Sequence, residues 1–220
     1  GGAGFIGSNL ATRLLELGHG VTIVDNFATG RRENLDPIRD RVDLHEADIR
    51  NYEEMCCAME GVEYVFHEGA LPSVPRSVEK PLESHDVNAT GTLTVLLAAK
   101  NAGVRRVIYA ASSSAYGDVE VSKKHEALAP RPVSPYGAAK LMGEYYCRVF
   151  HRVYGLETVC LRYFNVFGPR QNPNSPYTGV MAIFIPLMLR GERPLIFGDG
   201  SATRDYTYID NVVEANILAM

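Results

Sequence analysis

The sequence lacks tryptophan, has only four cysteines, and contains no apolar run near the roughly 20 residues that a bilayer span needs. Two of the cysteines, Cys56 and Cys57, are adjacent, and no set of cysteines and histidines has the spacing of a zinc site. The six histidines are scattered singly. We therefore expect reduced thiols in a cytoplasmic protein, no membrane segment and no metal site.

The sequence also has no excess of positive charge: it contains 22 lysines and arginines and 26 acidic residues, which gives a net charge of −4. This balance argues against a general nucleic-acid binder and against a protein that docks on anionic membranes. An anionic ligand would have to be held by local groups. A chain of 220 residues that is 46% hydrophobic is long enough for one buried α/β domain and part of another.

No methionine opens the chain, which starts at Gly1 inside a glycine-rich stretch and stops within a predicted helix at 211–220. We expect it to be part of a longer polypeptide, with a first strand and a C-terminal segment lying outside this sequence. Because the first strand is central in a doubly wound sheet, its absence predicts a weakened cofactor site.

Strand-like and helix-like stretches alternate along most of the chain, which is typical of a parallel sheet flanked by helices. The predicted helices are 5–17, 51–59, 82–102, 136–154, 180–190 and 211–220; the predicted strands are 21–25, 42–46, 62–67, 106–111, 157–161, 195–197 and 205–208. Residues 26–41 and 69–81 are predicted to be irregular. The fold class is therefore α/β, a doubly wound parallel sheet at 1–162 with part of a smaller region at 163–220.

Three glycines, Gly1, Gly4 and Gly7, stand directly ahead of the first predicted helix. This spacing permits a tight turn and lets a pyrophosphate approach the backbone at the helix N-terminus, where unpaired N–H groups favour an anion. An ordinary glycine-rich turn would look the same. The next predicted strand ends at Asp25, 18 residues after Gly7, close to the roughly 20-residue offset of a ribose-binding carboxylate.

Asp25 favours NAD over NADP, because a carboxylate accepts hydrogen bonds from ribose hydroxyls and repels a 2′-phosphate. Arg31 and Arg32 are the counter-evidence, and we interpret them as solvated loop charges. Asp48 follows the next strand, where it could meet the adenine amino group or simply cap a loop; the sequence favours neither alternative.

Tyr136 and Lys140 form a Y-x-x-x-K pattern on a predicted helix, so the phenol and the ammonium share one face. A free tyrosine has a pKa of about 10 and is a poor base at neutral pH. A nearby lysine and a cationic nicotinamide both favour the phenolate, and the lysine could also hold ribose hydroxyls. Without further context, the pattern would be an amphipathic surface pair.

A serine run, Ser112 to Ser114, follows the predicted strand 106–111. Ligands of open α/β sheets bind at the carboxyl ends of the strands, where a hydroxyl can contact a substrate hydroxyl and pass its proton toward Tyr136. The alternative is a polar turn. The glycine turn, the serine run and the Y-x-x-x-K pattern occur in order along one alternating chain, which argues against coincidence.

These stretches resemble the extended short-chain dehydrogenase/reductase superfamily, a Rossmann-fold group, and within it the NAD-dependent epimerase/dehydratase family with its UDP-glucose and UDP-N-acetylglucosamine 4-epimerases. The resemblance spans nearly all 220 residues and is carried by GGAGFIGSNL, VDNFATG, HEGALPSVPRS, DVNATGTL, ASSSAYGD, SPYGAAK, RYFNVFGPRQ and GDGSATRDYTYIDNV. It implies that 1–162 binds NAD and that 163–220 is part of a substrate-binding region. Glu68 and Gly69 depart from the apolar residue and alanine that the family often shows.

The resemblance assigns catalysis to Ser112, Tyr136 and Lys140. It implies a cofactor site made of Gly1, Gly4, Phe5, Ile6, Gly7, Asp25, Asn26, Asp48, Ile49, His67, Ala70, Asn88, Lys140 and Tyr163. The implied substrate contacts are Ser73, Ser113, Ser114, Asn165 and Arg204, of which Asn165 and Arg204 would hold the diphosphate. A guanidinium and an amide both suit phosphate oxygens.

The residues after Ser112 decide between reactions of the family. A 4,6-dehydratase resembling this chain would carry an Asp-Glu pair there, and a decarboxylase would keep a Glu, whereas this chain has Ser113 and Ser114. We therefore predict NAD-dependent 4-epimerisation of a UDP-hexose through a 4-keto intermediate. The alternatives are another nucleotide-sugar dehydratase or reductase, and a non-catalytic NAD-binding module.

The expected partners are a UDP-sugar and a second copy of the chain, because the long predicted helices 82–102 and 136–154 suit the four-helix dimer interface common in the family. Residues 70–74 resemble epimerases that accept N-acetylated hexosamines. The identity of the sugar, the pathway and the activity of this 220-residue segment alone cannot be read from the sequence.

Overall fold

The structure is a computed structural model that describes residues 1–119, 121, 123–173 and 179–220. Its strands pair in parallel. A three-stranded sheet has the order β3 (Tyr64–His67), β4 (Arg106–Ser112), β5 (Glu157–Tyr163); β1 (Thr22–Val24) pairs with β2 (Asp43–His45), and β6 (Asn165–Phe167) with β7 (Tyr206–Tyr208). In each pair, the two strands are joined by a crossover connection that contains one or more helices, as parallel strands require. The predicted α/β class is confirmed.

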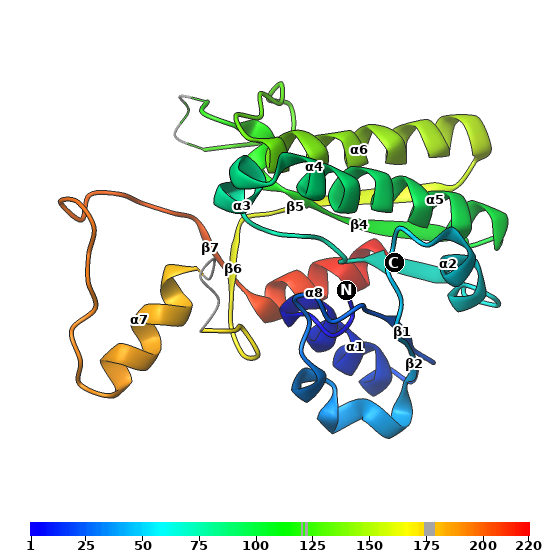
Figure 1. Ribbon diagram of the computed structural model, residues 1–220, viewed down its shortest axis with the longest axis horizontal. Helices are drawn as coiled ribbons and strands as arrows, with labels where there is room; N and C mark the ends of the chain where they lie inside the picture. Colours follow the sequence, from blue (N-terminus) through cyan, green and yellow to red (C-terminus); the bar gives the residue numbers. More distant parts are fainter. Residues whose placement is uncertain (120, 122, 174–178) are drawn as a thin grey trace.

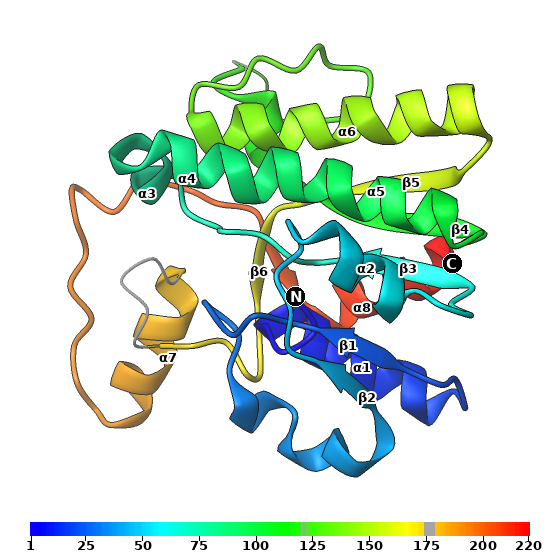
Figure 2. The ribbon, with the colours of Figure 1, turned by 45° about the vertical axis from the view of Figure 1, so that its right-hand side comes forward.

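Helices lie on both sides of these strands (Figures 1 and 2). α2 (Tyr52–Ala58), α5 (Gly91–Asn101) and α6 (Pro135–Tyr154) share one apolar core with the inner strands, while α1 (Phe5–Glu16) and α8 (Ile209–Ala219) pack against each other on the other side. Phe66 of β3 contacts the α1–α8 cluster, whereas Val65 contacts the opposite core. Because successive side chains of β3 point to opposite faces of the sheet, this one strand packs against the helices on both sides.

Local sequence accounts for the elements that hold the central part together. Residues 107–111 of β4 are at most 6% exposed, which fits a strand covered on both faces. α6 begins where the Ser134 hydroxyl accepts a hydrogen bond from the Gly137 N–H at 3.1 Å and Pro135 occupies the first turn, and it ends at Gly155 with a φ of 74°. These are the preferred residues at the two ends of a helix.

The structure corrects the sequence prediction in several places. Residues 69–81 are not wholly irregular, because α3 (Val74–Glu79) begins at Ser73, whose hydroxyl accepts from the Arg76 N–H at 3.1 Å. The predicted helix 82–102 is α4 (Pro81–His85), a π-helical turn η3 (Asp86–Thr90) and α5. The described residues also contain three short 3₁₀ segments, η1 (Arg32–Asn34), η2 (Asp36–Arg41) and η4 (Ser113–Tyr116).

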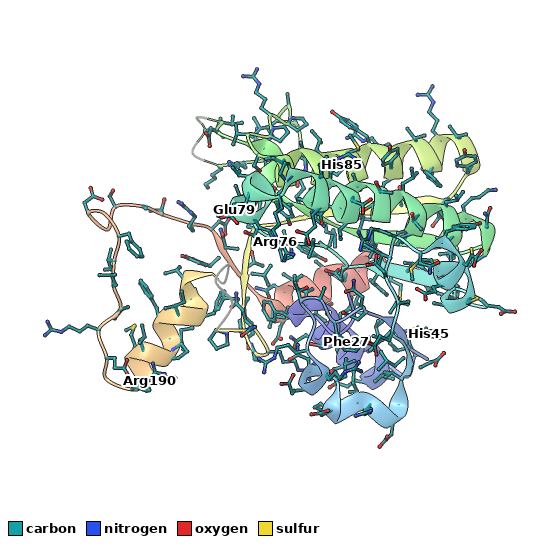
Figure 3. The ribbon with its side chains drawn as sticks, in the orientation of Figure 1. Phe27, His45, Arg76, Glu79, His85 and Arg190 are labelled. Carbon is teal, nitrogen blue, oxygen red and sulfur yellow. The ribbon has the colours of Figure 1, made fainter. Side chains whose placement is uncertain are left out.

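The C-terminal part differs most from the prediction. The strand predicted at 195–197 is wrong: Leu195 and Phe197 are 70% and 86% exposed and have no strand partner. The short strand β6 was not predicted. α7 (Val180–Leu189) stands apart from the sheet, and Arg190 at its end points away from the rest of the molecule (Figures 1 and 3). Its sequence is apolar, yet none of its residues is buried.

A space separates β1 from β3, which are not paired with each other (Figure 2). This cavity of about 540 Å³ is lined by residues of both strands, of α1 and of α2. The Gly1 nitrogen lies in this region and donates a hydrogen bond to the Val24 carbonyl at 2.6 Å. The sheet is thus divided at this point into β1–β2 and β3–β4–β5.

Within the described residues, no helix combines the length and apolar character that crossing a bilayer demands. The same ranges contain no group of three or more His, Cys, Asp or Glu side chains that could hold a metal ion.

Candidate functional site

A second cavity, of about 960 Å³, runs from the glycine turn to the carboxyl ends of β4 and β5. Its volume is at the upper end of the range of small-molecule sites, about 300–1,000 Å³. Its lining includes fifteen residues predicted from the sequence: Gly1, Gly4, Phe5, Ile6, Gly7, Asp25, Asn26, Asp48, Ile49, Ala70, Ser112, Tyr136, Lys140, Tyr163 and Asn165. Residues from opposite ends of the chain therefore meet at one site.

The glycine turn is too closely packed for side chains. A Cβ at Gly7 would lie 2.3 Å from the Gly1 carbonyl oxygen, and a Cβ at Gly1 would lie 2.4 Å from the Gly69 nitrogen. The turn leads directly into α1, and Phe5, Ile6 and Gly7 of its first turn line the cavity. This backbone cradle fits a dinucleotide pyrophosphate, which needs no charged side chain at such a position.

Asp25, at the end of β1, is 6% exposed and already oriented by backbone groups. Its Oδ2 accepts from the Ala3 N–H at 2.9 Å and its Oδ1 accepts from the Phe27 N–H at 2.8 Å. A carboxylate offers about four acceptor positions, so it can still accept bonds from ribose hydroxyls. A Cβ at Gly30 would lie 2.6 Å from Asp25 Oδ1, so the loop that contains Gly30 lies close against this carboxylate.

The two arginines near Asp25 are engaged elsewhere. Arg31 pairs with Glu33, and Arg32 pairs with Glu46 while its guanidinium lies 4.0 Å from the centre of the Phe27 ring. Phe27, labelled in Figure 3, packs against the apolar cluster that includes Ile23 and Leu35. Neither arginine lines the cavity, which agrees with their interpretation as loop charges.

Asp48 is held by three hydrogen bonds from two side chains. Asn26 Nδ2 donates at 2.9 Å, and the Arg50 guanidinium donates at 2.9 and 2.7 Å. Hydrogen bonds from Arg50 are the main reason that the pKa of Asp48 falls to about 2. Asp48 is therefore an anionic hydrogen-bond acceptor at the cavity wall, and Arg50 also bridges it to Asp86 at 2.6 Å.

The hydroxyl of Ser112 has a defined direction. Its oxygen accepts from the Ser114 N–H at 3.2 Å and from the Ser114 hydroxyl at 2.8 Å. Because a serine hydroxyl has two acceptor positions and one proton, its own proton is left for another group. Ser112 is hydrogen-bonded to the phenol of Tyr136, and this bond opposes the rise in the pKa of Tyr136, as expected if Ser112 donates.

Burial dominates the titration of Tyr136. It raises the pKa of the phenol to about 12, and the hydrogen bond from Ser112 offsets only part of that rise. The sequence predicted that Lys140 would favour the phenolate, but desolvation is the largest influence on the pKa of Tyr136. A cation bound in the cavity would lower the pKa of Tyr136, and a lower pKa is what the phenol needs in order to act as a base.

Lys140 lies one turn after Tyr136 and is 2% exposed. Its Nζ donates to the Ala110 carbonyl at 2.9 Å and lies 5.0 Å from the centre of the Tyr109 ring. Burial lowers its pKa to about 8, while the neighbouring Glu68 carboxyl raises it. The ammonium thus has one backbone partner and retains donors that can face the cavity.

Six predicted site residues do not line this cavity: Ser73, His67, Asn88, Ser113, Ser114 and Arg204. His67 is 3% exposed, contacts Thr92 at 2.9 Å, and has its pKa lowered well below the ordinary value by burial. Asn88 is 1% exposed and bonds both the N–H and the carbonyl of Leu71, at 2.9 and 3.1 Å. Asn88 therefore holds the loop after β3 through the backbone of Leu71, whereas His67 joins the end of β3 to Thr92 of α5.

Arg204 is exposed and donates to the Thr203 carbonyl at 2.7 Å. Its neighbour Asp205 accepts from the Asn165 side chain at 2.9 Å, so the segment before β7 is tied to the cavity wall. Arg204 thus stands one residue before this contact and does not itself line the cavity.

Sequence reasoning missed Arg76 and Glu83, which line the cavity, and gave Glu68 no role beyond its place in the stretch 67–71 expected to line the cofactor. Glu68 accepts from the Tyr163 hydroxyl at 2.9 Å, and that hydroxyl accepts from Asn216 Nδ2 at 2.6 Å. Arg76 extends from α3 toward the centre of the molecule and pairs with Glu83 of α4 at 3.0 Å (Figure 3). The departure of Glu68 from the family pattern marked it in the sequence, whereas Arg76 and Glu83 carried no such signal.

Comparison with known proteins agrees with this site. The model of the NAD-dependent epimerase/dehydratase family matches residues 1–220. A putative UDP-glucose 4-epimerase of Methanocaldococcus jannaschii is 39% identical, and the match covers 100% of this chain and 72% of that protein.

Two solved structures are similar to this chain over nearly all of its residues. UDP-glucose 4-epimerase of Thermotoga maritima, with UDP-glucose, is 45% identical with a TM-score of 0.94, covering 100% of this chain and 71% of that one. UDP-N-acetylglucosamine 4-epimerase of Methanobrevibacter ruminantium, in complex with UDP-N-acetylmuramic acid, is 41% identical with a TM-score of 0.94, covering 99% and 70%.

Proposed function

This chain belongs to the NAD-dependent epimerase/dehydratase family, and we propose on that premise that its protein interconverts the C4 epimers of a UDP-hexose. The observation that carries the proposal is the arrangement of Ser112, Tyr136 and Lys140 on the wall of one cavity that begins at a dinucleotide-type glycine turn. Such a set suits the removal of a hydroxyl proton next to a hydride acceptor.

NAD is the cofactor of the reaction, and this chain's residues fit it. The pyrophosphate would lie on the turn at Gly1, Gly4 and Gly7, with Asp25 on the adenosine ribose and Lys140 on the nicotinamide ribose. When bound, NAD⁺ supplies the acceptor for the hydride from C4 of the sugar and the donor for its return.

The protein side chains handle the proton. Tyr136, as a phenolate, takes the proton of the 4-hydroxyl, and Ser112 orients that hydroxyl and relays the proton. Lys140 places a positive charge within one helical turn of the phenol, which stabilises its ionised form. After the keto sugar turns over, Tyr136 returns the proton to the oxygen as the carbon is reduced on its other face. Electrons and protons thus return to the sugar, and no net redox change remains.

Epimerisation is favoured over dehydration by the two residues after Ser112. Elimination of water needs an added acid and base beside the sugar, and Ser113 and Ser114 carry only hydroxyl groups. Ser114 is moreover committed to Ser112 through two hydrogen bonds. A dehydratase or reductase of the same family is the alternative.

We further propose that residues 163–220 contribute the diphosphate end of the substrate site through Asn165 and Arg204. Asn165 lines the cavity, and Arg204 precedes the residue that Asn165 bonds. Ser73 precedes α3 near the sugar end, and the likeness of residues 70–74 to enzymes for N-acetylated hexosamines favours such a sugar as a second substrate. The similarity to a UDP-N-acetylglucosamine 4-epimerase supports that choice.

A homodimer is proposed through the outer faces of α5 and α6. These helices expose large apolar side chains, including Tyr145, Val149 and Val153 of α6 at 50%, 49% and 64% exposure and Leu97 of α5 at 39%. An apolar stripe of this kind on two adjacent helices suits a four-helix interface. If Val149→Glu leaves the sedimenting mass of the protein unchanged, this interface is wrong.

A cytoplasmic location is also proposed. All four cysteines are free thiols, which fits a reducing compartment.

The function is tested by incubating the protein, expressed from its complete reading frame, with UDP-galactose or UDP-N-acetylgalactosamine and separating the products by chromatography. We expect conversion to the corresponding glucose-configured nucleotide without added reductant. Sustained consumption of reduced cofactor, or accumulation of a stable keto sugar, would instead identify a reductase or a dehydratase.

A further inference from the structure

The segment 165–171, which begins with β6, is joined to α1 by side chains that the proposed chemistry does not use. The segment lines the cavity through Asn165, Val166 and Gln171, and it turns beside the N-terminal half of α1 (Figures 1 and 2). α1 in turn begins at the glycine turn on which the pyrophosphate of the cofactor would lie. The contact therefore joins the cofactor side of the cavity to its substrate side.

Arg170 makes the first connection between the segment and α1. Its Nη1 donates to the Ser8 carbonyl at 2.7 Å and to the Thr12 hydroxyl oxygen at 3.0 Å. The Thr12 hydroxyl itself donates to the Ser8 carbonyl at 2.9 Å, so the three groups form a closed set of hydrogen bonds. Both acceptors of Arg170 are uncharged, and the guanidinium therefore acts here through directed hydrogen bonds.

Asn9 makes a second connection to the same turn. Its Nδ2 donates to the Pro169 carbonyl at 3.1 Å and to the Phe5 carbonyl at 2.8 Å. Phe5 belongs to the first turn of α1 and lines the cavity. One amide group thus links the start of the cofactor helix to the residue that precedes Arg170.

The backbone of this turn also shows that the side chain of Arg170 matters. Arg170 has a φ of 71°, in the left-handed region that a residue with a Cβ adopts only at a cost in free energy and that glycine adopts readily. The hydrogen bonds to α1 offset this cost. At Gly168 a Cβ would lie 2.5 Å from Ile209 Cγ2, so the other side of the turn packs closely against the start of α8.

We propose that Arg170 is a positioning residue, which holds the segment 165–171 against the cofactor helix and so places the cavity wall that receives the substrate diphosphate. This role rests on the proposed function, because it assumes that Asn165 and its neighbours hold the diphosphate. Arg170 itself does not line the cavity and acts through its contacts with Ser8 and Thr12.

The test is the affinity for UDP of the protein expressed from its complete reading frame and loaded with NAD, measured by isothermal titration. UDP carries the diphosphate, and its binding requires no turnover. Arg170→Met removes the hydrogen-bond donors, and we expect the Kd for UDP to rise about tenfold with the Kd for NAD unchanged. During turnover, the KM for UDP-galactose should rise while kcat stays the same. Arg170→Lys keeps a donor and should recover part of the affinity.

Thr12→Val distinguishes a positioning role from a direct contact between Arg170 and the ligand. Thr12 does not line the cavity, so loss of its hydroxyl reaches UDP only through Arg170. We expect the Kd for UDP to rise about threefold in Thr12→Val. The double variant should bind UDP as weakly as Arg170→Met alone. An unchanged Kd in Thr12→Val, or effects that multiply in the double variant, would overturn the proposal.

Arg39→Met is the matched control, because Arg39 is an exposed arginine of η2 that does not line the cavity. Its Kd for UDP should equal that of the wild type, and a rise like that of Arg170→Met would overturn the proposal. If Arg170→Met does not fold, Asn9→Ala removes the other connection and should also weaken UDP binding; an unchanged Kd would contradict the proposed role. A wild type that binds UDP but does not epimerise refutes the proposed function, while the Kd values for UDP still test Arg170.

Discussion

Ser114 donates two hydrogen bonds to the Ser112 hydroxyl oxygen, from its backbone N–H at 3.2 Å and from its side chain at 2.8 Å. Both acceptor positions of Ser112 are thereby filled, and its single proton is directed to Tyr136. Within the serine run, Ser114 therefore orients the hydroxyl group of Ser112.

The first prediction follows from this contact. Ser114→Ala removes the side-chain bond but leaves the backbone bond, so Ser112 can rotate away from Tyr136. We expect kcat to fall about fivefold, the effect of one hydrogen bond worth about 1 kcal/mol, with the Kd for NAD unchanged. Ser113→Ala is the matched control, since no hydrogen bond from Ser113 supports Ser112. Equal rates for the two variants would contradict the role given to Ser114.

A second prediction concerns the glycine turn. In Gly7→Ala the new Cβ would lie 2.3 Å from the Gly1 carbonyl, so the turn must open and the Kd for NAD should rise at least tenfold. Gly20→Ala is the control, because a Cβ there meets nothing within 4 Å. Isothermal titration with NAD compares the two variants, and unchanged affinity in Gly7→Ala would show that the cofactor does not use this turn.

The third prediction is the stability cost of Lys140. Burial lowers its pKa from 10.5 to about 8, so its ammonium costs stability below pH 8, on the order of 3 kcal/mol. The unfolded chain binds the proton more tightly, so this cost disappears as the pH rises from about 8 to about 10.5. Lys140→Met should therefore abolish turnover yet raise the Tm at neutral pH without NAD, by several degrees.

The same variant supplies its own check. The difference in Tm between Lys140→Met and the wild type should shrink as the pH rises through that window. A difference that is constant with pH would mean that the ammonium is not the cause.

The fourth prediction concerns the ion pair that fixes α6 to β5. Arg162 meets Glu144 with two bonds of 2.8 and 2.7 Å, and their side chains are 16% and 7% exposed. Glu144→Gln leaves the Arg162 charge buried and unmatched, so we expect a loss of about 3 kcal/mol in urea unfolding. The double variant Glu144→Met with Arg162→Met should lose less than the single one. The reverse order would refute the pair as the source of the loss.

The parts of the site that could be predicted from the sequence are those with local signatures. The spacing of Tyr136 and Lys140, the glycine turn and the acid at the end of β1 all depend on the periods of helices and strands. They lie on the wall of one cavity. The α/β class followed from the same alternation.

The remainder depends on contacts between distant residues. Glu68 acquires its hydrogen bond from Tyr163, 95 residues later, and that tyrosine is held by Asn216, another 53 residues along. α3 was missed because three prolines in 69–81 indicated loop, whereas Pro75 and Pro81 stand in the first turns of α3 and α4. The strand predicted at 195–197 had a suitable composition but no neighbouring strand to pair with.

The measurement that tests the epimerase proposal most directly uses UDP-galactose that carries deuterium at C4. Because the hydride that leaves C4 returns to the same carbon, we predict UDP-glucose with the deuterium retained at C4, and no turnover in Tyr136→Phe. Loss of the label from the sugar, or turnover of Tyr136→Phe at the wild-type rate, would contradict the account.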